Sequence, residues 1–168
     1  FQVAARRPYQ AVLPDPRMPG ACWFPGAELN YAEHALRRRD DHLALVAHSE
    51  TRPVRALTYA ELYGQVGAVA AALRRLGVRP GDRVAAYLPN IPEAVVAFLA
   101  ASSLGAVWAS CPPEFGLRSV LERFRQIRPR VLFAVQGYRY KGRVQDRREE
   151  VRELARAPFA DDGERLEV

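Results

Sequence analysis

The sequence has 168 residues, of which 49% are hydrophobic and 26% are charged, and its mean hydropathy is -0.22. This composition is typical of a globular domain and excludes disordered and collagen-like chains. A chain of this length buries about 68–70% of the surface that it exposes when unfolded, which is enough for a core without disulfides. Cys22 and Cys111 form no C-x-x-C pair, so the sequence predicts unreactive thiols and a reducing compartment, the cytoplasm.

The charge balance is basic, but the charge is not concentrated. The chain has 25 Lys and Arg residues against 19 Asp and Glu residues, a formal net charge of +6, and Lys141 is its one lysine. A nucleic-acid-binding surface needs a cluster or stripe of cations, which this spread does not provide. The uncharged stretch 94–113 is long enough to cross a membrane, but Gly105 and Pro112 interrupt it. We therefore expect no nucleic-acid partner and no membrane span.

The beginning of the chain differs from the rest. Residues 1–40 are rich in proline and glycine and predict an irregular N-terminal arm that ends in a short helix over about residues 29–38. Residues 43–48 and 54–57 are two short apolar runs separated by turn-forming residues, and they predict a β-hairpin.

Residues 41–157 predict a partial α/β domain in which helices and strands alternate. The clearest helix begins at Thr58, which forms a capping box with Glu61, and ends at Gly77. Asn90 is predicted to cap a second helix, with Pro92 in its first turn, and Pro129 to end a third. The strands are expected at 83–88, 106–111 and 131–135, followed by a last charged helix at 144–156 and a polar tail at 158–168.

Apolar strands that alternate with helices are typical of a parallel sheet covered by helices on both faces. The predicted fold class is therefore α/β. In such sheets, ligands bind at the carboxyl ends of the strands. The segments after Leu88, Cys111 and Val135 are accordingly the places where a functional site is expected.

Most motifs that carry chemistry are missing from the sequence. His34, His42 and His48 match no zinc-binding spacing. There is no G-x-G-x-x-G, no lysine-containing phosphate loop and no G-x-S-x-G. The sequence therefore predicts neither a metal site nor a catalytic residue in this chain.

The residues after the last predicted strand combine positive charge with aromatic rings. Residues 137–143 read Gly-Tyr-Arg-Tyr-Lys-Gly-Arg and bring Arg139, Lys141 and Arg143 close together in sequence. Arginine pairs with phosphate oxygens through two parallel hydrogen bonds, and lysine adds a compact charge. The segment indicates a phosphate-binding turn, and the alternative is an exposed basic loop without a ligand.

Five blocks of the sequence resemble a known family, and the first and third blocks illustrate this. The first reads Trp-Phe-Pro-Gly-Ala-Glu-Leu-Asn-Tyr-Ala-Glu and the third Gly-Val-Arg-Pro-Gly-Asp-Arg-Val. In this order they resemble the N-terminal part of the AMP-forming acyl-CoA synthetases, the superfamily of adenylate-forming ligases. Within it the chain is most similar to the acetoacetyl-CoA synthetases, as residues 105–116 and 137–140 indicate. The blocks cover residues 23–33, 57–62, 77–84, 89–94 and 105–110.

The resemblance implies a fold and a reaction. The chain would form the first part of the large N-terminal domain of an adenylate-forming ligase. Such an enzyme uses ATP and Mg²⁺ to convert a carboxylic acid, here acetoacetate, into an acyl-adenylate, and then transfers the acyl group to coenzyme A in lipid metabolism. The phosphate loop, the ATP-binding aspartates and the adenylation lysine of the family have no match here. The resemblance places them further along a longer chain and implies that this chain alone is inactive.

The resemblance also implies roles for individual residues. In related acetyl-CoA synthetases, the stretch that matches Arg139, Lys141 and Arg143 lies near the 3′-phosphate of coenzyme A. The loop that matches Pro113 and Glu114 borders the adenine ring. These five are therefore the expected cofactor-binding residues. The alternatives that stay open are a ligase for acetate or another short-chain acid, a non-catalytic coenzyme- or nucleotide-binding module, and an interaction domain with a basic surface.

Overall fold

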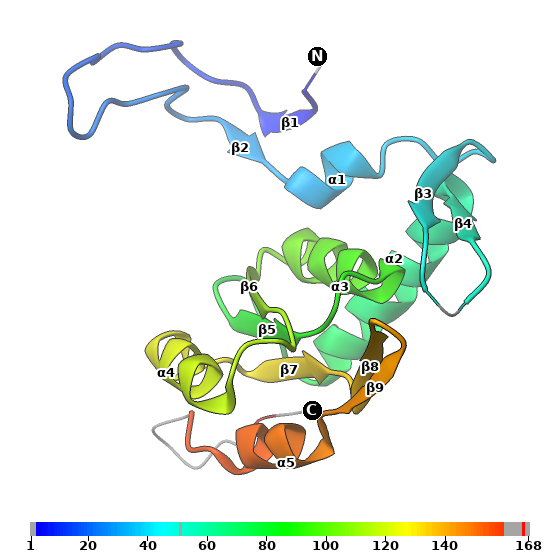
Figure 1. The fold of residues 1–168 in the computed structure, drawn as a ribbon. Helices are drawn as coiled ribbons and strands as arrows, with labels where there is room; N and C mark the ends of the chain where they lie inside the picture. The colour runs from blue at the N-terminus through cyan, green and yellow to red at the C-terminus, as the bar shows by residue number, and fades with distance from the viewer. Residues whose placement is uncertain (1–2, 51, 160–165, 167–168) are drawn as a thin grey trace.

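The computed structural model describes residues 3–50, 52–159 and 166 of the chain. They form an extended N-terminal arm and a body in which helices pack around a small sheet (Figure 1). The elements of the arm and of the first hairpin are β1 (Ala5–Arg7), β2 (Glu28–Leu29), α1 (Tyr31–Ala35), β3 (Leu43–Ala47) and β4 (Arg55–Thr58). Those of the body are α2 (Tyr59–Arg75), β5 (Arg83–Tyr87), α3 (Pro92–Ser103), β6 (Val107–Cys111), α4 (Leu117–Ile127), β7 (Val131–Ala134), β8 (Gly137–Tyr140), β9 (Arg143–Asp146) and α5 (Arg148–Arg156).

The arm is attached to the body through α1. Strands β1 and β2 pair antiparallel with one another, and α1 is shorter than the helix that the sequence predicts. Asn30 caps α1 by accepting the backbone N–H of Glu33, and its Nδ2 donates to the carbonyl oxygen of Ser102 in α3. Tyr31 packs against Phe98 of α3 with 5.5 Å between the ring centroids. These contacts fix the end of the arm on the body.

The first hairpin and the first long helix agree with the sequence. Strands β3 and β4 pair antiparallel, as predicted. The side chain of Thr58 accepts the N–H of Glu61, and the Glu61 carboxylate accepts the N–H of Thr58, which confirms the capping box of α2. The chain leaves the helix at Gly77, whose φ of 77° is a conformation that glycine adopts without strain.

The central sheet is parallel and has the order β6–β5–β7. Val84 of β5 lies opposite Trp108 of β6 and Val131 of β7. Helix α3 connects β5 to β6 and α4 connects β6 to β7, because parallel strands of one sheet need a crossover connection. The three predicted strands and their parallel arrangement are thus confirmed, with small differences at the strand ends.

The start of α3 differs from the prediction. Ile91, rather than Asn90, is the N-cap, and it makes no side-chain capping hydrogen bond. The ring of Pro92 disfavours helical geometry in the residue before it, so Ile91 is extended and the helix begins at Pro92. The uncharged stretch 94–113 is divided between α3 and β6. In the described part of the chain, none of the helices combines the length and the apolar character needed to span a bilayer.

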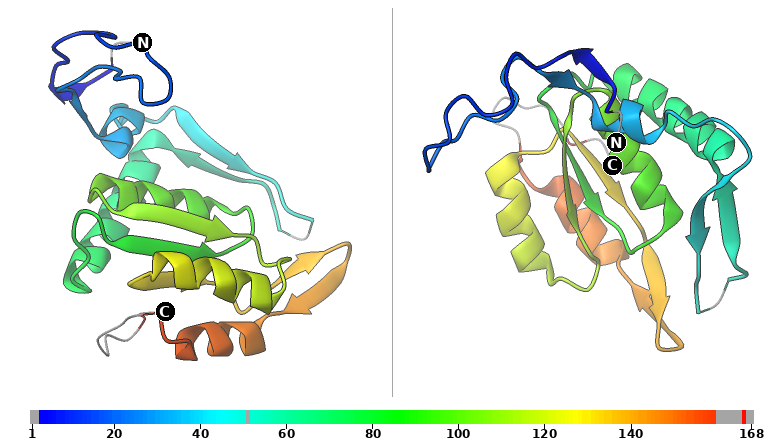
Figure 2. Two further views of the ribbon diagram at one scale, coloured as in Figure 1. Left: turned by 90° about the vertical axis from the view of Figure 1, so that its left-hand side faces the viewer. Right: turned by 90° about the horizontal axis from the view of Figure 1, so that it is seen from above.

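Side chains of β5 alternate between two hydrophobic clusters. Val84 joins a cluster with residues of α2 and α3, such as Leu73. Ala85 and Tyr87 join a second cluster with residues of α4 and α5, such as Phe124. Figure 2 shows α2 and α3 on one side of the strands and α4 and α5 on the other. Burial in both directions explains why the sequence of β5 is apolar after its first residue rather than alternating with polar residues.

The chain after β7 differs from the prediction. Residues 137–146 form the antiparallel hairpin β8–β9, where the sequence predicts a turn followed by a helix from residue 144. Helix α5 begins at Arg148. The carboxylate of Asp146 accepts the backbone N–H of Arg148 at 3.0 Å, which satisfies a donor in the first turn of the helix.

The predicted polar tail, 158–168, lies largely outside the described residues. Phe159 is described and is 4% exposed. Its ring lies 6.3 Å from that of Phe124 in α4, measured between centroids. The packed body therefore extends at least to Phe159.

We expect Leu73→Ala to lower the free energy of unfolding by about 2–5 kcal/mol, because truncating a buried leucine leaves a cavity. Leu73 is 1% exposed, in the cluster with α2 and α3. Leu76, 39% exposed at the C-cap of α2, is the matched control, and Leu76→Ala should cost less than about 1 kcal/mol. Urea unfolding followed by circular dichroism measures both changes. Equal losses would contradict the described packing of α2.

Candidate functional site

Tyr87, the last residue of the central strand, holds the loop that follows β6. Its side chain is 1% exposed, and its hydroxyl lies 2.9 Å from the carbonyl oxygen of Pro113 and 3.1 Å from that of Phe115. Removal from water raises the pKa of Tyr87, so the hydroxyl keeps the proton that these two acceptors share. The end of β5 therefore fixes the course of the loop at residues 112–116.

Arg147 joins this loop to the chain that follows β7. Its Nε donates to the carbonyl oxygen of Pro113 at 2.8 Å, and its Nη1 pairs with the Glu150 carboxylate at 3.1 Å. The guanidinium also lies over the ring of Tyr138 in β8, 5.7 Å from its centroid. Burial would lower the pKa of Arg147, but the interactions with Tyr138 and Glu150 raise it, so the side chain stays charged. The segments after β6 and after β7 are thus one connected unit.

The two candidate residues of the loop differ in their exposure. Pro113 is less than 2% exposed, and its carbonyl oxygen already accepts from Tyr87 and Arg147. Glu114 is exposed. A ligand can reach the carboxylate of Glu114, whereas the ring of Pro113 is packed inside the protein.

The hairpin β8–β9 turns at Lys141 and Gly142. Both residues have positive φ, 50° and 73°, as in the two-residue type I′ turns that match the twist of paired strands. Gly137 is needed for the pairing itself, because an added Cβ would lie 2.7 Å from the carbonyl oxygen of Gln145 in the partner strand. Gly137 and Gly142 therefore shape the hairpin.

The tip of this hairpin is held by a residue from a distant part of the chain. Glu50, in the connection between β3 and β4, accepts the backbone N–H of Lys141 and that of Gly142, each at 3.0 Å. Figures 1 and 2 show the tips of the two hairpins side by side. The N–H groups of Gly142 and Lys141 lower the pKa of Glu50, and the positive charge of Lys141 adds to this effect.

The three candidate cations do not converge on one point. In the register of the hairpin, Tyr140 lies opposite Arg143, and Arg139 belongs to the next pair of residues. The side chains of successive pairs point to opposite faces of the hairpin. Arg143 therefore shares a face with Tyr138 and Tyr140, while Arg139 lies on the other face. The ammonium group of Lys141 lies 5.3 Å from the ring centroid of Tyr140. Lys141 therefore lies beside the ring of Tyr140, and Arg143 lies on the same face of the hairpin as that ring.

The face that carries Arg143 is the face turned towards the loop at 112–116. Tyr138, on the same face, contacts Arg147, which in turn donates to the carbonyl oxygen of Pro113. Among the described residues, neither Arg139 nor Arg143 has an ion-pair partner, so both guanidinium groups are available to an anionic ligand.

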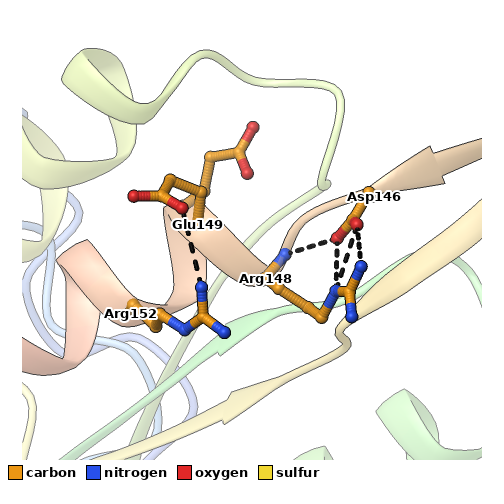
Figure 3. A pocket seen from close by; sticks show the side chains of 5 residues that line it. Asp146, Arg148, Glu149 and Arg152 are labelled. Carbon is orange, nitrogen blue, oxygen red and sulfur yellow. Dashed lines mark hydrogen bonds and ion pairs between the residues drawn. The ribbon is translucent and has the colours of Figure 1, made fainter.

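A surface hollow of about 360 Å³ at the start of α5 is not an anion site. Figure 3 shows its two arginines paired with carboxylates, Arg148 with Asp146 at 2.6 Å and Arg152 with Glu149 at 3.6 Å. Glu150 adds a further carboxylate to the lining. The guanidinium groups are thus already neutralised and leave no excess positive charge for a phosphate.

The two cysteines differ from one another. Cys111 is buried at the end of β6, and burial raises the pKa of its thiol, in agreement with the predicted lack of reactivity. Cys22 is exposed in the arm.

Sequence reasoning did not identify Glu50, Tyr87 and Arg147, the residues that hold the backbone of the candidate site. Glu50 and Arg147 form hydrogen bonds with backbone groups that are distant in the sequence, and no local sequence pattern predicts such contacts. Tyr87 did carry a signal, because a hydroxyl at the end of an apolar, buried strand needs a hydrogen-bond partner.

Comparison with known proteins places this geometry in a family. A profile described as AMP-binding enzyme matches residues 32–166. Because this is most of the chain, the chain belongs to the AMP-binding enzyme family.

Within that family, its similar relatives are acetoacetyl-CoA synthetases. It is 48% identical to the acetoacetyl-CoA synthetase of Rattus norvegicus over 123 residues, which are 72% of this chain and 18% of that protein. It is 42% identical to the acetoacetyl-coenzyme A synthetase of Rhizobium meliloti (strain 1021) over 148 residues, 88% of this chain and 23% of that protein. The solved structure of acetoacetyl-CoA synthetase from Streptomyces lividans matches 92% of this chain and 24% of that chain, with a TM-score of 0.87 and 59% identity. The chain thus spans about a fifth of the length of the curated relatives it matches.

Arg148→Gln should raise the pKa of Asp146. The side chain of Arg148, and then its backbone N–H, lower this pKa from 3.8 to about 2. Because the folded pKa lies below the unfolded value, ionised Asp146 stabilises the fold above pH 3.8, and this contribution is lost as the pH falls through about 2. Titration of the carboxyl carbon by NMR measures the pKa. Arg152→Gln is the control and should change it less, since Arg152 acts only through its charge; an unchanged value in Arg148→Gln would contradict the described pair.

Proposed function

We propose that this chain is the N-terminal region of an acetoacetate–CoA ligase, an AMP-forming acid–thiol ligase. The complete enzyme would activate acetoacetate with ATP to an acyl-adenylate and then transfer the acetoacetyl group to the thiol of coenzyme A. The observation that carries the proposal is the joint match in sequence and fold to an acetoacetyl-CoA synthetase of known structure over almost the whole chain. The names of the curated relatives support the same substrate.

In that enzyme the sheet β6–β5–β7, with helices on both faces, would be the first part of the large N-terminal domain. The alternation of β5 side chains between two helix-containing clusters supports this arrangement. Residues 41–157 would form this part, with residues 1–40 as an arm before it and 158–168 as a polar connection after it. We place the enzyme in the cytoplasm.

The chemistry of adenylation would be carried out by segments that this chain does not contain. ATP supplies the adenylyl group, and Mg²⁺ would neutralise its phosphates. Within residues 3–50, 52–159 and 166, no three His, Cys, Asp or Glu side chains lie close enough together to hold a metal ion. No Mg²⁺ ligand and no catalytic step is assigned to these residues.

The contribution of this chain would be to bind coenzyme A between the hairpin β8–β9 and the loop at 112–116. Arg143 and Lys141 would contact the 3′-phosphate from one face of the hairpin, and Arg139 would add positive charge from the other. Glu114 would lie beside the adenine ring, and Pro113 would act through the backbone that its buried position fixes. The exposed, unpaired guanidinium groups and the fixed loop support this assignment.

We expect the 168-residue chain to form no acetoacetyl-CoA from acetoacetate, ATP and coenzyme A, because the groups that hold ATP would lie elsewhere in the complete enzyme. Chromatographic detection of the thioester measures this, with a full-length acetoacetyl-CoA synthetase assayed alongside as the control. Turnover by the purified chain would refute the proposed division of labour.

In the full-length protein, Arg143→Ala should weaken coenzyme A binding about tenfold to a hundredfold, since a hydrogen bond to a charged group contributes about 1.5–3 kcal/mol. Arg139→Ala should weaken it by less than about tenfold, because Arg139 lies on the opposite face of the hairpin. Acyl-adenylate formation, measured by pyrophosphate exchange, should be unchanged in both variants because it precedes the coenzyme step.

Two comparisons make this test specific. Dephospho-coenzyme A, which lacks the 3′-phosphate, should bind wild type and Arg143→Ala almost equally. Arg17→Ala removes an exposed arginine from the arm and should affect neither half-reaction. Equal losses in adenylation and thioester formation would assign the hairpin a structural role, and no loss in either would show that it does not bind coenzyme A.

A further inference from the structure

We infer that Glu50 is a positioning residue for the coenzyme A phosphate, an inference that rests on the function proposed above. Glu50 lies in the connection between β3 and β4, far in sequence from the cations that would contact the phosphate. It touches none of their side-chain nitrogens through a hydrogen bond. Its effect would pass through the backbone of the turn that carries them.

The contact holds the hairpin tip at two points. The Oε1 atom of Glu50 accepts the N–H of Lys141 at 3.0 Å, and Oε2 accepts the N–H of Gly142 at the same distance. Each carboxylate oxygen thus has its own donor, so the contact fixes the orientation of the turn as well as its place. A contact between charged and neutral groups of this kind is stronger than one between two neutral groups.

This contact matters because the rest of the tip has little support. Arg139, Tyr140, Lys141 and Arg143 are all exposed. The base of the hairpin is held at its other end, where the N–H of Arg147 donates to the carbonyl oxygen at position 136 and its guanidinium covers Tyr138. A hairpin held only at its base would move at its tip, and a ligand would have to order the cations as it binds. With Glu50 in place, the backbone that carries the cations is already held before the phosphate arrives.

The same geometry also allows an alternative in which Glu50 weakens coenzyme A binding. The carboxylate of Glu50 is itself an anion on two N–H groups, which are donors that a phosphate could use. If it competed with the phosphate, removing its charge would tighten coenzyme A binding. Positioning is favoured because Glu50 uses only backbone donors and leaves the guanidinium groups of Arg139 and Arg143 free.

Glu50→Gln in the full-length protein tests the inference. The amide keeps the size of the side chain, but it has no charge and replaces one acceptor oxygen with a donor nitrogen. We expect the KM for coenzyme A to rise about threefold to tenfold, the range for a weakened, solvent-exposed contact. The kcat at saturating coenzyme A and the rate of pyrophosphate exchange should stay the same. With dephospho-coenzyme A, the variant and wild type should have nearly equal KM values.

Hydrogen exchange provides a readout that does not depend on activity. The segment 137–146 should exchange faster in Glu50→Gln than in wild type, because two amide hydrogens at the tip lose their carboxylate acceptor. Glu93→Gln is the matched control. It removes an exposed ion pair, at 2.8 Å, between Glu93 of α3 and Arg55 of the hairpin β3–β4, which also carries Glu50. The contact between Glu50 and the tip of β8–β9 stays intact. Glu93→Gln should change neither the KM for coenzyme A nor this exchange rate.

The outcomes separate this inference from the proposed function. A lower KM in Glu50→Gln would show that the carboxylate competes with the phosphate and would overturn the inference. So would an unchanged KM, or an equal loss of pyrophosphate exchange, which would indicate a general structural role. If Arg143→Ala raises the KM and Glu50→Gln does not, the inference alone fails. If Arg143→Ala also has no effect, the proposed coenzyme site fails with it.

Discussion

The burial of β5 on both of its faces is the constraint on which the rest of the body depends. Its middle residues, Ala85 and Ala86, are fully buried and small, so the layers on either side can approach the strand closely. Its two neighbours pair with it and not with each other, so its position sets theirs. Its last residue, Tyr87, fixes the loop at 112–116, because its hydroxyl donates to two carbonyl oxygens of that loop. A larger side chain at either alanine would displace helices and loop together.

The candidate site is built by polar groups that fix backbone rather than by groups that would contact the ligand. Tyr87 and Arg147 hold the carbonyl oxygen of Pro113, and Glu50 holds the N–H groups of the hairpin tip. The charged side chains that would meet coenzyme A are exposed and have several rotatable bonds. Their arrangement therefore depends on contacts made by residues that never touch the ligand.

The sequence is informative where the structure is buried and uninformative where it is not. The apolar strands and the capping box at Thr58 could be predicted because burial and local hydrogen bonds leave a pattern in neighbouring residues. The hairpin β8–β9 could not, because its strands are polar and its turn is Lys-Gly rather than Asn-Gly. The sequence indicates the cations Arg139 and Arg143, but it predicts that they lie in a turn. In the structure they lie on two paired strands, which place their side chains differently. Only the register shows that they point to opposite faces.

The sheet also has a consequence for how the polypeptide behaves when handled alone. In the described part of the chain, β6 and β7 each pair with β5 only, so the outer edge of each presents backbone N–H and C=O groups without a strand partner. An edge of this kind is a template for another strand. In a longer protein of the family, later strands can add there, whereas separate copies of this chain can satisfy the same groups only in water or by joining edge to edge. Association of separate copies would then proceed through backbone hydrogen bonds at these two sheet edges.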